Sequence, residues 1–193
     1  MGDRVRACGD CSLCCTVLRV DELRKLGGVP CLHQNPSGPG CSIHPERPGI
    51  CRGYRCLWLE GGLDERDRPD RIGAVLDVVH DGAVGRLEIR QDRAGRFDGS
   101  ARLGEIAEEY RASMPVRITD VEEVMDSDRP YRVLLPNGEE HRVRGEWTEI
   151  HRPGRAPELR RLSWVERWVR RVVLGGRRIR LRHARAVGPR PAR

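Results

Sequence analysis

Eight cysteines lie within the first 56 residues of this 193-residue chain, and no cysteine follows them. They are Cys8, Cys11, Cys14, Cys15, Cys31, Cys41, Cys51 and Cys56. A thiol can form a disulfide, coordinate a metal as the thiolate, or react as a nucleophile. This concentration of thiols therefore indicates one of three kinds of chemistry, and the surrounding sequence must distinguish them.

Two features of the sequence disfavour a disulfide framework. The first ten residues, MGDRVRACGD, lack the apolar stretch of a secretory signal. We therefore expect a cytoplasmic protein, and the cytosol keeps thiols reduced. A bridge between the adjacent Cys14 and Cys15 would also be strained. Metal coordination is the favoured interpretation.

The spacing of the first four cysteines is typical of metal sites. A C-x2-C step places two thiolates on a tight turn where they can hold one ion, and here two such steps share Cys11. The run is similar to the C-x2-C-x2-C part of bacterial iron–sulfur motifs, except that Cys15 follows Cys14 directly. Both zinc and iron–sulfur clusters accept four thiolates, so the spacing leaves the metal open. It also leaves open two sites, one shared multinuclear site, or one site with spare thiols.

The order of the cysteines and their neighbours resembles a known family. The later cysteines stand in Cys41-Ser42-Ile43-His44-Pro45-Glu46-Arg47-Pro48 and Cys51-Arg52-Gly53-Tyr54-Arg55-Cys56. With the earlier Cys8-x2-Cys11-x2-Cys14-Cys15 and Cys31, this pattern resembles the CxxCxxCC (YkgJ-like) family, described as a zinc- or iron-chelating domain. The resemblance covers about residues 8–59 and implies metal binding without a reaction. Some relatives carry the cluster in a flagellin lysine N-methylase, which implies an alternative: an iron–sulfur redox protein or a protein-modifying enzyme.

Four residues near the cysteines have side chains that suit a metal site. His33 and His44 each lie within three residues of a cysteine. Because a four-cysteine site needs no nitrogen ligand, and the family usually has tyrosine at the position of His44, we interpret both as loop residues. Arg47 and Arg52 flank Cys51, and we expect them to offset the negative charge of a thiolate site.

The rest of the chain must scaffold this region, and its pattern predicts an α+β fold. We divide the chain into a cysteine-cluster region (1–59), an α+β region with two hairpins and one helix (60–150), and a basic helix with a disordered tail (151–193). Residues 21–27 are expected to form a short helix, and residues 60–71 a connector. Strands are expected at 72–79, 84–91, 116–119, 131–135 and 140–143, with Leu87 and Ile89 on one face. Ser100 is expected to cap a helix that ends before Pro115.

Composition limits the functions that the chain can have. We find no glycine-rich phosphate loop, no G-x-S-x-G and no H-E-x-x-H, so the sequence indicates no catalytic site. No apolar run is long enough for a transmembrane helix. Arginine is used almost to the exclusion of lysine, and Lys25 is the only lysine.

The C-terminal segment differs from the rest in its charge. Residues 151–193 contain fourteen arginines and two glutamates, a balance of +12, which leaves −5 for residues 1–150. Apolar residues recur at helical spacing from Leu159 to Val172, and we expect this stripe to pack on the core. The basic segment can also contact nucleic acid or an anionic surface, which makes a nucleic-acid-associated metalloprotein a further alternative.

Overall fold

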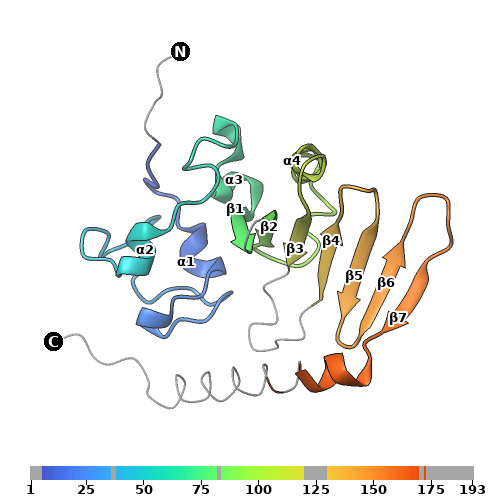
Figure 1. Ribbon diagram of the computed structural model, residues 1–193. Helices are drawn as coiled ribbons and strands as arrows, with labels where there is room; N and C mark the ends of the chain where they lie inside the picture. Colours follow the sequence, from blue (N-terminus) through green and yellow to red (C-terminus); the bar gives the residue numbers. More distant parts are fainter. Residues whose placement is uncertain (1–5, 36–37, 82–83, 120–129, 170–171, 173–193) are drawn as a thin grey trace.

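The computed structural model describes residues 6–35, 38–81, 84–119, 130–169 and 172, and it confirms the predicted α+β class. One seven-stranded sheet carries its strands in chain order (Figure 1). Strands β2 and β3 run parallel, and all other neighbours run antiparallel. The strands are β1 (Ala74–Asp81), β2 (Val84–Gln91), β3 (Val116–Thr119), β4 (Tyr131–Leu134), β5 (Glu140–Arg144), β6 (Trp147–His151) and β7 (Glu158–Arg161).

The helices named in the structure are short, apart from α4. They are α1 (Leu13–Val17), η1 (Asp21–Leu23), α2 (Gly49–Gly53), η2 (Glu65–Asp67), α3 (Pro69–Ile72) and α4 (Ala101–Arg111). The helix expected at 21–27 is only the single 3-10 turn η1, because Arg24 adopts the left-handed conformation and Val20 pairs with Lys25. The cysteine region is therefore built mainly from turns and short helices.

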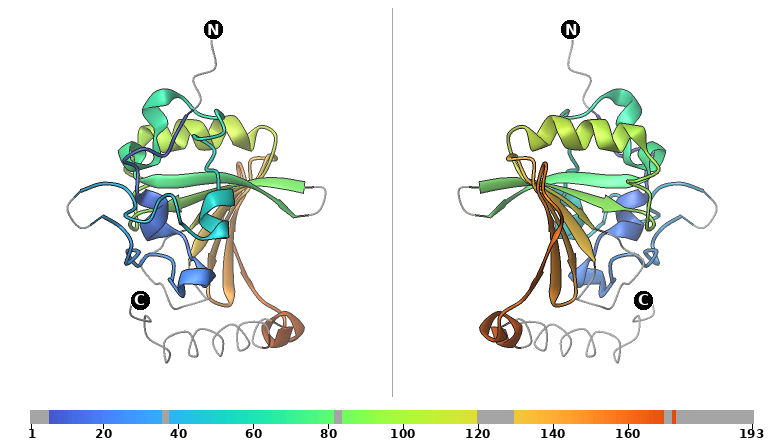
Figure 2. Two further views of the ribbon diagram at one scale, coloured as in Figure 1. Left: turned by 90° about the vertical axis from the view of Figure 1, so that its left-hand side faces the viewer. Right: turned by 90° about the vertical axis from the view of Figure 1, so that its right-hand side faces the viewer.

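Strand β1 is covered on both faces, which explains its nearly continuous apolar sequence. Successive strand residues point to opposite faces. Leu76 belongs to the main core with Leu103 of α4, whereas the neighbouring Val75 packs with Val17 of α1. Figure 2 accordingly shows α4 on one side of β1 and β2 and the cysteine-bearing segment on the other. The cysteine region therefore packs on the face of the sheet opposite α4.

The other predicted elements of the 60–150 region are largely confirmed. Strand β2 has the predicted bounds, and its Leu87 and Ile89 are fully buried in the main core. The hydroxyl of Ser100 accepts a hydrogen bond from the Leu103 backbone N–H, which is the expected cap of α4. The first strand begins at Ala74 and not at Ile72, since Ile72 completes α3.

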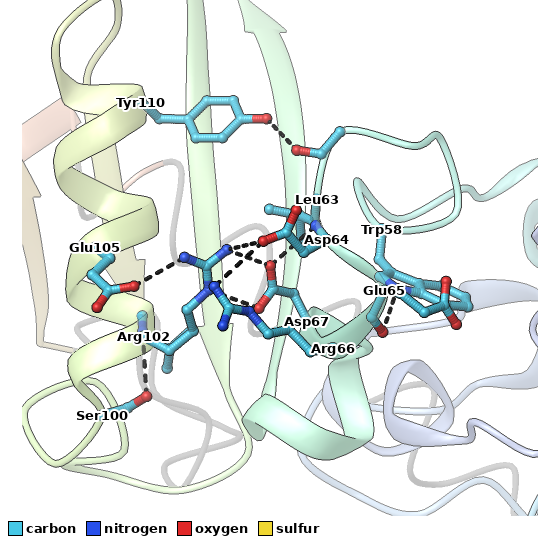
Figure 3. Close-up of polar contacts among 12 residues, drawn as sticks. Trp58, Leu63, Asp64, Glu65, Arg66, Asp67, Ser100, Arg102, Glu105 and Tyr110 are labelled. Carbon is cyan, nitrogen blue, oxygen red and sulfur yellow. Dashed lines mark hydrogen bonds and ion pairs between the residues drawn. The ribbon is translucent and has the colours of Figure 1, made fainter. Parts of the chain in front are cut away.

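Residues 60–71 form a packed segment and not a simple connector (Figure 3). The carboxylate of Asp67 is fully buried and accepts hydrogen bonds from Arg102 Nε at 2.8 Å and Nη2 at 2.7 Å. The same carboxylate accepts from the Asp64 backbone N–H, which closes the capping box of η2. Tyr110 also donates its hydroxyl hydrogen to the Gly62 carbonyl. Helix α4 is therefore joined to this segment at two points.

The prediction for the C-terminal stripe was wrong. Leu159 lies in β7, which pairs with β6, so the sheet extends past residue 150. A helix starts only after Ser163, whose hydroxyl accepts from the Glu166 backbone N–H. Its Trp164 and Trp168 side chains are 74% and 64% exposed, and therefore do not pack on the core. The predicted tail, residues 177–193, lies outside the described residues.

Within the described residues, no helix has the length and apolar character needed to cross a membrane. The cytoplasmic location stays a prediction.

Candidate metal centre

Seven of the eight cysteines line one cavity on the sheet face opposite α4. The cavity has a volume of about 370 Å³. The cysteines that line it are Cys8, Cys11, Cys14, Cys15, Cys31, Cys41 and Cys51. Cys56 is packed instead beside the Val17–Val75 cluster, where Cys14 also lies. The fold therefore gathers seven thiols that are spread between residues 8 and 51 of the sequence.

Local hydrogen bonds place the first four cysteines. The Cys11 backbone N–H donates to the Cys8 carbonyl at 2.9 Å, so the first C-x2-C step forms a tight turn. Gly9 within this turn has φ +54°, a conformation that favours glycine. Cys14 and Cys15 follow on helix α1, whose Val17 is buried against β1.

The later cysteines are tied to α1 by longer-range contacts. The Cys31 backbone N–H donates to the Cys15 carbonyl at 3.1 Å. Cys41 forms an isolated β-bridge with Gln34, whose side-chain amide donates to the Ser12 hydroxyl just before α1. Cys51 lies on α2, next to Ile50, whose backbone N–H donates to Glu22 of η1.

The adjacent thiols of Cys14 and Cys15 form a hydrogen bond. The hydrogen bond from the Cys14 thiol lowers the pKa of Cys15 to about 7, and the nearby Lys25 charge acts in the same direction. That same hydrogen bond, together with burial, raises the pKa of Cys14. Of the two thiols, Cys15 is therefore the more acidic.

Burial raises the pKa of Cys11, Cys51 and Cys56. For Cys51, the charges of Cys15, Cys31 and Cys41 raise the pKa further. A site that gathers thiols in this way disfavours several uncompensated thiolates, and a bound cation would remove that penalty.

Lys25 supplies a buried positive charge at this site, and the sequence reasoning did not assign it a role. Its side chain lines the cavity and the residue is 7% exposed. The ammonium donates hydrogen bonds to the carbonyls of Thr16, Leu18 and Leu26. Burial lowers the pKa of Lys25, whereas the neighbouring cysteine charges raise it. A three-donor ammonium suits three carbonyls, which explains lysine at this position in an arginine-rich chain. Its uniqueness in the sequence was the available signal.

The two candidate arginines occupy different environments. Arg47 is half-buried in the cavity wall and donates to the His44 carbonyl at 2.6 Å and to the Cys51 carbonyl at 3.4 Å. Arg52 is exposed on α2 and lies outside the residues that line the cavity. His33 and His44 both line the cavity, with the His44 ring 3.1 Å from Arg47.

The sheet contributes the wall of the cavity that faces the cysteines. Asp77 of β1 and Arg90 of β2 form an ion pair there, and burial raises the pKa of Asp77 despite this partner. The Tyr54 hydroxyl is buried and has no hydrogen-bond partner among the described residues, and burial raises its pKa. Asp77 and Arg90 meet through the pairing of β1 with β2, and Tyr54 joins them only where the cysteine segment packs on these strands, so no local sequence signal predicts this wall.

The donor chemistry of the site fits a soft or borderline metal, although the side chains are not arranged around one. All eight cysteines are free thiols. Among the described residues, no three cysteine, histidine or carboxylate side chains converge as a preformed metal site. Thiolate ligands suit zinc and iron–sulfur clusters. Coordination would therefore require the thiol side chains to turn toward a common centre.

Comparison with known proteins adds no assignment. Neither the protein-family models, nor the curated proteins, nor the solved structures contain a match to this chain.

Proposed function

We propose that this protein binds zinc or iron through its eight cysteines. The observation that supports the proposal is the gathering of seven thiols around one cavity, beside a buried ammonium. Cysteines that bind a metal do so as thiolates, so binding would release protons and would be favoured by the Lys25 charge. The bound metal would also contribute folding free energy to a region made mainly of turns.

The experiment is anaerobic purification of the full chain, followed by elemental analysis and an absorption spectrum. Stoichiometric zinc without visible bands would identify a zinc protein. A brown protein with broad visible absorption would identify an iron–sulfur protein. The double variant Cys11→Ser/Cys51→Ser should lose metal, whereas Ser42→Ala, which alters an exposed hydroxyl in the same region, should retain it. Full metal content in the double variant would contradict the proposal.

The cavity favours a second candidate function, an enzyme or redox protein of the iron–sulfur or protein-modifying class. Its volume of about 370 Å³ is within the range of small-molecule sites. A structural zinc site is usually closed, whereas this cavity keeps the unpartnered Tyr54 hydroxyl and the Asp77–Arg90 pair within reach of the thiols. Reversible bleaching of visible absorption by dithionite would support redox chemistry, and a colourless zinc protein would exclude the iron–sulfur form.

The exposed helix after Ser163 favours an accessory function, association with an anionic membrane surface. Trp164, Val165, Trp168 and Val169 are exposed, and Arg167 lies among them. Tryptophans and arginines on one short helix are typical of segments that lie at a lipid interface. The full chain should bind vesicles of phosphatidylglycerol and phosphatidylcholine, but not vesicles of phosphatidylcholine alone. Trp164→Ala/Trp168→Ala should abolish the binding. Binding to DNA that survives this double change would instead favour the nucleic-acid alternative.

A further inference from the structure

The eight cysteines fall into two groups of four by their positions in the fold. The first group, Cys8, Cys11, Cys14 and Cys56, lies where the N-terminal turn meets the segment before β1. The second group, Cys15, Cys31, Cys41 and Cys51, lies between α1 and α2. In Figure 1, α1 lies between α2 and β1. Cys51 belongs to α2, whereas Cys14 and Cys56 pack with Val75 of β1.

Backbone and packing contacts hold the first group together. The Cys11 N–H donates to the Cys8 carbonyl, and Cys14 and Cys56 pack against the same Val17–Val75 pair. Arg6 joins the two ends of the group, because its guanidinium donates to the carbonyls of Trp58 and Leu63, each at 2.7 Å. Within this group Cys8 interacts with Cys14 and Cys56, and Cys11 interacts with Cys14, although the strongest interaction of Cys14 is with its neighbour Cys15.

Separate contacts hold the second group together. The Cys31 backbone N–H donates a hydrogen bond to the Cys15 carbonyl. Gln34 pairs with Cys41 in an isolated β-bridge. The Gln34 side chain also forms hydrogen bonds with Ser12 and Thr16, which lie on either side of Cys15 in the sequence. The charges of Cys15, Cys31 and Cys41 all act on Cys51. Lys25 interacts with Cys31, Cys15 and Cys51 of this group and with Cys14 of the first group.

Cys14 belongs to the first group and the adjacent Cys15 to the second, and helix geometry explains why neighbours can differ in this way. Successive residues of an α-helix point about 100° apart, so two neighbouring side chains on α1 face different surroundings. Cys14 packs at the cluster beside β1, whereas the Cys15 carbonyl accepts from the Cys31 backbone N–H and the Cys15 thiol interacts with Cys51. Their thiols still touch, so two centres built on them would be close neighbours.

We propose that the chain holds two four-cysteine metal centres, one formed by Cys8, Cys11, Cys14 and Cys56 and the other by Cys15, Cys31, Cys41 and Cys51. Four thiolates complete the shell of one zinc ion or one iron–sulfur cluster. The second centre lies beside Lys25 and opens onto the cavity. The first is packed against the sheet, and its Cys56 is the one cysteine outside the cavity wall. The inference rests on the proposed function, since it divides the same eight ligands.

The test compares two kinds of double variant in the full chain, loaded with zinc under reducing conditions and analysed for metal per chain. Unmodified protein should hold two zinc equivalents. A within-group variant, Cys8→Ser/Cys56→Ser or Cys31→Ser/Cys41→Ser, should lose one equivalent. A cross-group variant with the same number of changes, Cys8→Ser/Cys41→Ser, should lose both.

A second measurement needs no variant that might misfold. Unmodified protein loaded with cadmium should give two cadmium NMR resonances typical of four-sulfur sites. Equal loss in within-group and cross-group variants, or a single cadmium resonance, would overturn the division into two centres. One metal equivalent in the unmodified protein would overturn the division and leave the proposed function intact, whereas no metal at all would refute the proposed function itself.

Discussion

Lys25 provides the sharpest test of how the cysteine region is built. Replacing it by methionine preserves most of the side-chain length and removes the ammonium. The carbonyls of Thr16, Leu18 and Leu26 then lose their hydrogen-bond donor. Water cannot readily replace it, because Lys25 is only 7% exposed. At about 1 kcal/mol of net stabilisation for each hydrogen bond, Lys25→Met should lower the free energy of unfolding by about 3 kcal/mol. That is a large part of the stability of a domain of this size.

The assay is urea unfolding of the metal-free and metal-loaded protein, followed by tryptophan fluorescence. Lys25→Arg is the first control, because it keeps the charge but presents a planar set of donors that fits three converging carbonyls poorly. Arg52→Met is the second control, since it removes an exposed positive charge next to Cys51 and should change stability by less than about 0.5 kcal/mol. Lys25→Met should also weaken metal binding about tenfold, as is typical when a group supporting the ligands is removed. Lys25→Met with the stability and metal affinity of the Arg52→Met control would refute this reasoning.

Three further predictions concern the scaffold. Because Arg102 holds the pKa of Asp67 below its ordinary value of 3.8, this carboxylate should stabilise the fold fully above that pH and progressively less below it. Asp67→Asn should therefore destabilise the protein at pH 7, with a difference from the unmodified chain that shrinks as pH falls below 3.8, as measured by urea unfolding; a constant difference would contradict the ion-pair account. Ser100→Ala should lower the unfolding free energy by about 1 kcal/mol, since the Leu103 N–H loses its acceptor, whereas Ser100→Thr should retain most of the stability. Gly73→Ala should cost more than about 1 kcal/mol by thermal unfolding, because Gly73 has φ +69° and an added Cβ would lie 2.3 Å from the Arg96 side chain; an unchanged melting temperature would contradict this packing.

Local sequence signals were sufficient to predict those elements whose structure depends mainly on their own residues. The alternation in 84–91 predicts the buried face of β2 because a strand that packs one face on a core requires period two. Ser100 predicts the start of α4 because its hydroxyl supplies an acceptor to an otherwise unpaired backbone donor. Both predictions are confirmed.

Long-range pairing decided the features that the sequence did not reveal. The apolar spacing around Leu159 fits a helix, yet β6 offers an unpaired edge and residues 158–161 pair with it as β7. Asp77 and Arg90 are paired across β1 and β2, and Tyr54 shares a cavity wall with them only because the cysteine segment packs on the sheet. The cysteine spacing likewise predicts metal binding, but it does not assign the eight cysteines to the two proposed centres. That assignment depends on how the turns pack around α1.

Thiol accessibility before and after metal removal tests the central claim most directly. The full chain, purified anaerobically, is titrated with Ellman's reagent in its native state and again after a strong chelator has removed the metal, while the released metal is quantified. If the cysteines coordinate zinc or iron, most of the eight thiols should react slowly at first, and all eight should react once the metal is released. Eight thiols that react at the same rate in both titrations, with no metal released, would contradict the claim.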